Sequence, residues 1–191
     1  CLASWTHPVW PLDQALHSPL TVVALGLLIA YARRPATRDG DVALLCGFLV
    51  LHCVGSRWLY SNVPYDAWCQ SLLGFSPQTV FGWERNHFDP LVHPAYGSCF
   101  APATTHGLRA GSRLGGGHAF VLMLLLVIAS SLVYEWLEWA IALALAPEQA
   151  EAYNGQQGDP WDAHADMLLA TVGAACWAAR LIREPDAGMP R

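Results

Sequence analysis

The 191-residue sequence contains no lysine, and only 13% of its residues are charged. Soluble domains usually carry about 25% charged residues, so this deficit indicates a protein that lies in lipid. The ten arginines are outnumbered by acidic residues, which gives a net charge of -5. The sequence lacks the basic surface that binding to DNA or RNA requires, and we therefore expect no nucleic-acid partner.

Motifs of several well-known enzyme classes are also missing. The chain has no nucleophile elbow, phosphate-binding loop, HExxH pair, haem-attachment motif or dinucleotide fingerprint. Its six cysteines show no CxxC or zinc-knuckle spacing, so we predict neither a thiol metal site nor a disulfide framework. The sequence begins at Cys1 without a visible signal peptide, which predicts that an initial segment is missing.

Apolar residues make up 54% of the chain and form five long stretches: residues 18–32, 41–60, 90–105, 118–146 and 160–182. A helix needs about 20 residues to cross a hydrocarbon core that is ~30 Å thick. We therefore predict an all-α, polytopic bundle of about five transmembrane helices in one membrane domain, residues 1–191. The third stretch is short and contains Pro94 and Pro102, so a re-entrant segment is a second interpretation of it.

The arginines predict the orientation of the bundle. Eight of the ten follow the first or third stretch or lie near the C-terminus: Arg33, Arg34, Arg38, Arg109, Arg113, Arg180, Arg183 and Arg191. The positive-inside rule places these segments and the C-terminus in the cytoplasm, and Cys1 outside. An outside start predicts a sixth span ahead of the first stretch. We expect a multi-pass protein of the bacterial inner membrane.

Carboxylates gather at the outer ends of the last two stretches. Glu135 and Glu138 are spaced i, i+3 and so share one helix face, and Asp162 and Asp166 lie one turn apart. Acids inside a membrane are costly and normally face a partner or a function within the bundle. Asp166 lies beyond the first turn, where capping could explain an acid, which makes it the strongest single candidate for a functional residue.

Two Asp-Pro pairs, at 89–90 and 159–160, are typical of helix starts. In each pair we expect the aspartate to cap the helix and the proline to be its first residue. Asp89 and His93 would then share a face of the third stretch, with His87 in the loop before it. His93 is either a core residue with satisfied hydrogen bonds or a ligand, and the sequence leaves both interpretations open.

Positive charge that could balance these acids is scarce. Arg57, which follows His52 on the second stretch, is interpreted as a fixed counter-charge, and Arg85 is the other arginine in the outer half. The opposing carboxylates are five: Asp89, Glu135, Glu138, Asp162 and Asp166. An unbalanced buried cluster requires protonated acids or a bound cation. Histidine with carboxylates suits Zn, Fe or Mn, and carboxylates with water suit Mg, Ca or Mn.

Four segments, residues 52–66, 81–93, 134–139 and 158–168, together resemble the YjdF-type bacterial inner-membrane proteins, which carry a domain of unknown function. The family usually has a further span before the first stretch. This chain departs from it at three places, with Cys53 where the family often has Glu, Pro90 where it has Arg, and Thr105 or His106 where it has Glu. The resemblance covers a retained set: His87, Asp89, His93, Glu135, Glu138, Asp162 and Asp166. A more distant similarity is to the VanZ-type membrane proteins.

Three functions fit these residues, and whether the protein is an enzyme stays open. The leading hypothesis is a divalent-metal site that acts on a lipid or envelope substrate. Its metal ligands would be Glu135, Glu138, Asp166 and His93, with acid-base or supporting contacts from Asp162, His87 or Asp89. The second is a small transporter or proton-coupled permease that uses the same acids as a relay, although the halves show no internal repeat. The third is a non-catalytic accessory protein whose acids neutralise Arg57 and Arg85.

Overall fold

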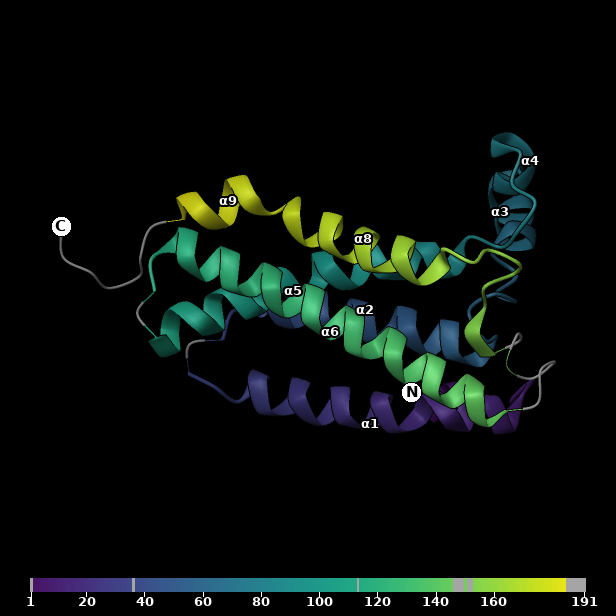
Figure 1. Ribbon diagram of the computed structural model, residues 1–191, viewed down its shortest axis with the longest axis horizontal. Helices are drawn as coiled ribbons and strands as arrows, with labels where there is room; N and C mark the ends of the chain where they lie inside the picture. Colours follow the sequence, from purple (N-terminus) through teal and green to yellow (C-terminus); the bar gives the residue numbers. More distant parts are fainter. Residues whose placement is uncertain (1, 36, 113, 146–149, 151–152, 185–191) are drawn as a thin grey trace.

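A computed structural model describes residues 2–35, 37–112, 114–145, 150 and 153–184. Within these residues all regular structure is helical, which confirms the predicted all-α class. The elements are η1 (Leu2–Trp5), α1 (Pro11–Ala32), α2 (Asp39–Arg57), α3 (Tyr65–Leu73), α4 (Pro77–Phe81), α5 (Phe88–Ser112), α6 (Gly116–Ala144), α8 (Asp162–Ala175) and α9 (Ala178–Arg183). The long helices lie side by side along the longest axis, and α9 continues the line of α8 (Figure 1).

In the part of the chain that the structure describes, four helical segments are long and apolar enough to cross a membrane: α1, α2, α6 and the combined segment Asp162–Arg183. The less apolar α5 runs alongside them, and its 25 residues extend about 37 Å. It packs against α2, α6 and α8, so other helices cover much of its surface and it needs fewer apolar side chains. The alternative of a re-entrant third stretch is wrong, because α5 continues through Pro94 and Pro102.

Small residues bring α5 and α8 into backbone contact. A Cβ atom at Gly97 would overlap the carbonyl oxygen of Ala170, and one at Gly173 would overlap the carbonyl oxygen of Pro94. The hydroxyl of Ser98 donates a 3.0 Å hydrogen bond to the Gly173 carbonyl. Small residues permit such close approach between membrane helices, where lipid supplies little hydrophobic drive for association. This contact fixes α5 and α8 relative to each other.

Both predicted helix starts are shifted by two residues, in opposite directions. Helix α5 begins at Phe88, whose amide donates a 2.9 Å hydrogen bond to the side chain of Asn86. Asn86 therefore takes the capping role expected of Asp89. Helix α8 begins at Asp162, two residues after Pro160, and the Asp159 side chain accepts a hydrogen bond from the Trp161 amide in the turn that precedes it.

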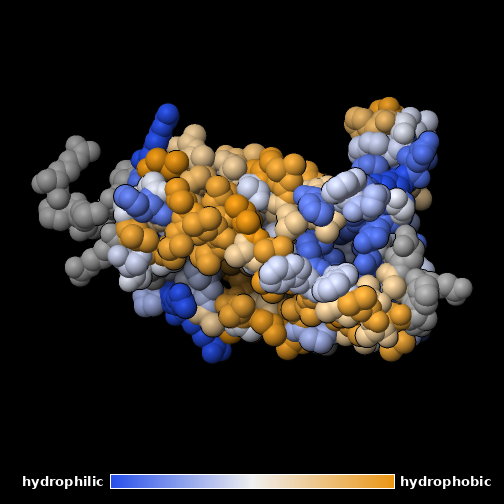
Figure 2. Space-filling view, in the orientation of Figure 1, coloured by the Kyte–Doolittle hydropathy of each residue, from blue (hydrophilic) through white to orange (hydrophobic). Residues whose placement is uncertain are grey.

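The arginine-bearing connections lie at one end of the bundle, together with the end of α9 (Figure 1). Apolar side chains cover much of the visible surface in the middle of the bundle (Figure 2). Hydrophilic side chains gather toward its two ends. We call the arginine-bearing end the inner end and the opposite one the outer end, following the predicted orientation. The predictions for Cys1, Arg113, Ala146 and Arg191 concern residues outside the described ranges.

Helices α3 and α4 stand apart from the bundle at its outer end (Figure 1), and the sequence analysis did not anticipate them. Ser76 caps α4 by accepting a hydrogen bond from the Thr79 amide. The Asp66 carboxylate accepts hydrogen bonds from the Ser76 hydroxyl and the Gln78 amide, which ties α3 to α4. These contacts place a small structured extension beside the outer end.

Candidate functional site

Asp89, His93 and Asp166 meet near the outer end of the bundle. Each offers one ligand atom, and the three atoms lie within 4.8 Å of one another. Asp89 and His93 are one turn apart on α5, and Asp166 lies in the second turn of α8. The His93 Nε2 atom is 3.6 Å from an Asp89 oxygen and 3.5 Å from an Asp166 oxygen. We call these three residues the outer triad.

The distances in the outer triad are long for hydrogen bonds, whose N–H···O separation is usually about 2.7–3.2 Å. They are close to what two ligands of one ion show. Metal–ligand bonds of about 2.1 Å at tetrahedral angles place the ligand atoms about 3.4 Å apart. The His93 nitrogen therefore lies at ligand-like distances from two carboxylate oxygens, and all three atoms lie within 4.8 Å of one another.

Carboxylate oxygens around the triad lack hydrogen-bond partners. Asp166 is 3% exposed, and among the described residues nothing donates to its Oδ1 atom. Likewise, no described residue donates a hydrogen bond to the buried Oε1 atom of Glu135. Electrostatic interactions couple Glu135 to His93 and Glu138 to Asp89, so both glutamates approach the triad from α6. A buried carboxylate without a hydrogen-bond donor destabilises the folded protein, and a bound cation would offset this cost.

The structure divides the predicted metal ligands differently from the sequence analysis. His93 and Asp166 lie together as expected, but the third member of the compact group is Asp89, to which we had given an acid-base role. Glu135 and Glu138 are neighbours of the group and not members of it. The sequence analysis had assigned the Asp89 side chain to the helix cap, a role that Asn86 takes instead.

Arg85 is the arginine that balances acids at the outer end. Its guanidinium group lies 2.9 Å from an Asp162 oxygen and 3.1 Å from an Asp159 oxygen, and it also donates to the Gln156 carbonyl. Asp162 is 4% exposed and is thus a buried, paired carboxylate. This arginine links the start of α8 to the loop before α5, and the pairing differs from the catalytic role predicted for Asp162.

Three other candidates lie apart from the triad. The His87 ring stacks on Trp83 at a centroid distance of 4.2 Å, with its Nδ1 atom 2.9 Å from the Arg85 carbonyl oxygen. The guanidinium group of Arg57 donates to backbone carbonyls at the start of the chain, those of Ser4, Thr6 and His7, and its role as a counter-charge stays a prediction. These carbonyls satisfy the guanidinium group without an acid.

His52 connects the site to α1 through hydrogen bonds. Its Nε2 atom lies 2.7 Å from the Thr21 hydroxyl, and its Nδ1 atom meets the Tyr60 hydroxyl. Tyr60 reaches this position by folding back over Gly55, where any Cβ atom would overlap its ring. Leu59 and Tyr60 both have positive φ values, 50° and 52°, an uncommon conformation for residues other than glycine. No sequence motif marks this turn.

Two buried polar residues on α1 were missed by the sequence analysis. Gln14 and His17 are each 1% exposed, and the His17 ring stacks on Tyr153 at 4.8 Å. Our first predicted stretch begins after both. Their i, i+3 spacing ahead of the apolar run was the available signal, and it indicates a polar face turned toward the bundle.

A second polar group, which we call the inner network, lies at the other end of the bundle. The His106 ring is 2.7 Å from an Asp41 oxygen on one side and 2.9 Å from a Glu184 oxygen on the other. The Tyr31 hydroxyl donates a 2.8 Å hydrogen bond to Asp41, and Arg38 pairs with Glu184. The sequence analysis noted His106 only as a departure from the resemblance, because its partners come from distant segments.

Comparison with known proteins decides the family. A family described as "Predicted membrane protein (DUF2238)" matches residues 1–186. The chain belongs to this family. It is also 33% identical over 154 residues to the inner membrane protein YjdF of Escherichia coli strain K12, a match that covers 80% of this chain and 69% of the relative. No solved structure matches the chain. The predicted family and the multi-pass location in the inner membrane are confirmed.

Proposed function

We propose that the outer triad binds a divalent metal ion and that the protein uses this ion on a lipid or envelope substrate at the outer face of the inner membrane. The observation that carries the proposal is the spacing of His93 from the two carboxylates, 3.5 and 3.6 Å, together with the unpartnered Oδ1 atom of Asp166. One histidine and two carboxylates suit Zn, Fe or Mn.

Each neighbouring side chain would have a distinct part at such a site. Asp89, His93 and Asp166 would hold the ion, and Glu135 is placed to accept a proton or complete the ligand set from α6. A bound divalent ion polarises a substrate oxygen or activates water. Arg85 and Asp162 would position α8, and with it Asp166, through their ion pair.

The test is elemental analysis of the detergent-purified protein, prepared without chelators or nickel. We expect about one metal ion per chain in the wild type, and a loss of at least tenfold in Asp166→Asn and in His93→Gln. The matched controls are Glu84→Gln and His164→Gln, because both side chains are exposed residues of the same end. Equal metal content in wild type and triad variants would refute the site.

A proton relay is the second candidate, because His52 joins Tyr60 to Thr21 of α1 in a chain of hydrogen bonds. Chains of this kind move protons in membrane transporters. The test uses proteoliposomes with an internal pH dye. If the protein is a relay, His52→Ala, Glu138→Gln and Asp166→Asn should each slow the acidification of the interior. The purified wild type should then contain no bound metal.

A further inference from the structure

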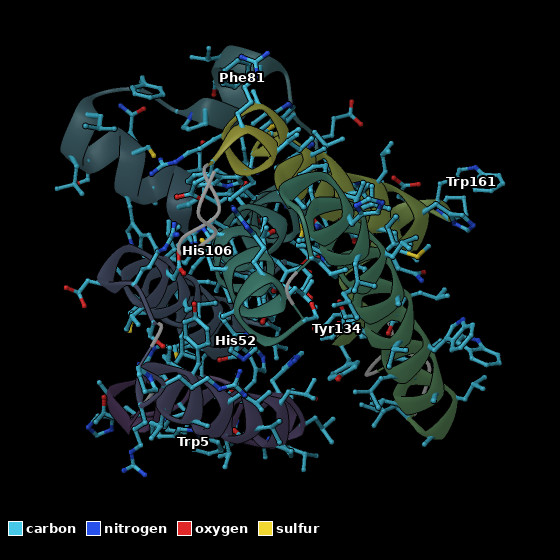
Figure 3. All side chains as sticks on the ribbon, turned by 90° about the vertical axis from the view of Figure 1, so that its left-hand side faces the viewer. Trp5, His52, Phe81, His106, Tyr134 and Trp161 are labelled. Carbon is cyan, nitrogen blue, oxygen red and sulfur yellow. The ribbon has the colours of Figure 1, made fainter. Side chains whose placement is uncertain are left out.

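A cavity of about 220 Å³ lies next to the outer triad, between α1, α2, α5 and α6. Its walls include Ala24, Phe48, Leu49, Tyr96 and Tyr134, and His93 of the triad forms part of its outer end. Figure 3, which looks along the bundle, places His52 and Tyr134 in the space between α1 and the other helices. We call it the outer cavity.

The lining of the outer cavity combines polar and apolar groups. His93 of the triad, His52 and Ser131 contribute polar groups, whereas Phe48 and Phe100 line it with apolar surface. Ser131 is 4% exposed, and its hydroxyl has no hydrogen-bond partner among the described residues. The cavity thus has polar groups beside the candidate metal site and apolar walls elsewhere. Such a lining suits an amphiphile whose headgroup lies toward the outer end and whose hydrocarbon chain lies toward the inner end.

A second cavity of about 460 Å³ continues toward the inner end. It shares Ala24, Phe48, Leu49 and Phe100 with the outer cavity, so the two meet at one wall. On α5 the outer cavity extends from Val92 to Phe100, which is roughly 12 Å of helix. One leaflet contributes about half of the ~30 Å hydrocarbon core, so this depth suits a chain from the outer leaflet.

Helix α1 closes the cavity only loosely. It packs chiefly against α2, and only 6% of its apolar window is buried. Its described buried residues, Gln14 and His17, both lie in its first two turns. From Ser18 onward, α1 therefore leaves room beside α6 through which a lipid chain can enter laterally from the bilayer.

We propose that the outer cavity binds one hydrocarbon chain of an outer-leaflet lipid, with the oxygen-rich anionic headgroup of that lipid directed to the outer triad. The headgroup part rests on the proposed metal site, because a group of acids without a cation would repel an anion. The chain part depends only on the cavity. The substrate class that follows is a phosphate-bearing membrane lipid.

Photolabelling tests the chain part. The probe is phosphatidic acid with a diazirine in one acyl chain, titrated into detergent-solubilised full-length protein, with labelled residues located by peptide mass spectrometry. We expect saturable labelling of the cavity lining, at Phe48, Tyr96 and Phe100. Ala24→Trp fills the cavity and should reduce this labelling at least fivefold, whereas Val23→Trp, on the exposed side of α1, should not.

A second pair of variants guards against misfolding. Leu49→Trp also fills the cavity from α2, and its neighbour Val50 is 66% exposed, so Val50→Trp is the control. Labelling that rises linearly with probe, or that both cavity variants retain, would refute the chain site.

Metal content measured in the same samples separates the two proposals. Metal in the wild type without saturable labelling would refute the lipid cavity and leave the metal site standing. Saturable labelling without any metal would refute the metal site and the headgroup assignment, while the chain site would stand. If both hold, labelling by the phosphatidic acid probe should weaken in Asp166→Asn, whereas a diacylglycerol probe with the same diazirine should label both proteins equally.

Discussion

The two ends of the bundle each hold a histidine between two carboxylates, but only one of these groups is fully paired. At the inner end, His106 lies 2.7 and 2.9 Å from Asp41 and Glu184, and further donors come from Tyr31 and Arg38. At the outer end, His93 lies 3.5 and 3.6 Å from its two acids, and Asp166 keeps an oxygen without a partner. Similar residue types thus produce a closed network and an open one.

These distances indicate which of the two groups is structural. A network whose members satisfy one another has no need for a ligand and serves to join segments, here α1, α2, α5 and the end of α9. A buried group whose carboxylate oxygens lack donors destabilises the fold unless a ligand such as a cation binds there. Composition alone would not have separated the two ends; the distances do.

The largest expected effect comes from separating the helices that carry the outer triad. Gly173→Val places side-chain atoms where the Pro94 carbonyl lies, so α8 must move away from α5. Overpacking of this kind costs about 1–3 kcal/mol or more. Since the motion parts Asp166 from His93, we expect metal content to fall at least tenfold along with the melting temperature.

Gly47→Val is the matched control for this change. Gly47 also lies within a helix, and a Cβ atom there meets nothing within 4 Å. We expect its metal content to equal that of the wild type. Retention of full metal content by Gly173→Val would show that the triad does not depend on backbone contact between α5 and α8.

Replacing an aspartate by asparagine should have a smaller effect on stability, and the sign of this effect should differ between the two ends. Asp41→Asn removes one charge from a paired, buried network and should lower the free energy of unfolding by about 3 kcal/mol. Asp166→Asn, measured on chelator-treated protein, removes a charge that lacks a donor and should leave the melting temperature unchanged or raise it. Thermal unfolding in detergent measures both.

Asp39→Asn serves as the control for the inner end, because Asp39 is exposed in the same turn of α2 as Asp41. Its substitution should cost less than about 1 kcal/mol, the usual size of a helix-dipole contribution. Equal destabilisation by Asp41→Asn and Asp166→Asn would contradict the division into a closed and an open group.

Much of the fold follows from local patterns, which the sequence displays directly. The apolar stretches predicted the crossing helices, and α1, α2 and α6 appear where expected, although α1 begins seven residues earlier than its stretch. Residues 160–182 form two helices, α8 and α9, with a break at Cys176 and Trp177. Hydropathy does not show such a break, because apolar residues lie on both sides of it.

The candidate site was only partly predictable, because side-chain direction depends on tertiary contacts. Spacing identified Asp166 and His93, since each stands out against an apolar face. It placed Asp89 on the same face as His93 but did not assign it to the group of ligands, and it could not show that Arg57 donates to backbone carbonyls of the first residues. The inner network was missed for the same reason, because Asp41, His106 and Glu184 are far apart in sequence.

The smallest expected effect concerns the pH dependence of the inner network. Partial burial favours the protonated form of Glu184, but hydrogen bonds from His106 and Arg38 outweigh it, so the pKa of Glu184 lies below its usual value of 4.5. A carboxyl whose pKa is lower in the folded state stabilises the fold above its unfolded pKa, and this contribution disappears as pH falls through the folded pKa. Glu184→Gln should therefore lower the melting temperature at pH 7, and the difference from wild type should shrink below about pH 4.5.

The control is Glu84→Gln, which replaces an exposed carboxylate at the other end and should show no such convergence with the wild type. A Glu184→Gln difference that stays constant from pH 7 to pH 3 would show that the inner network is held by packing and not by its charges.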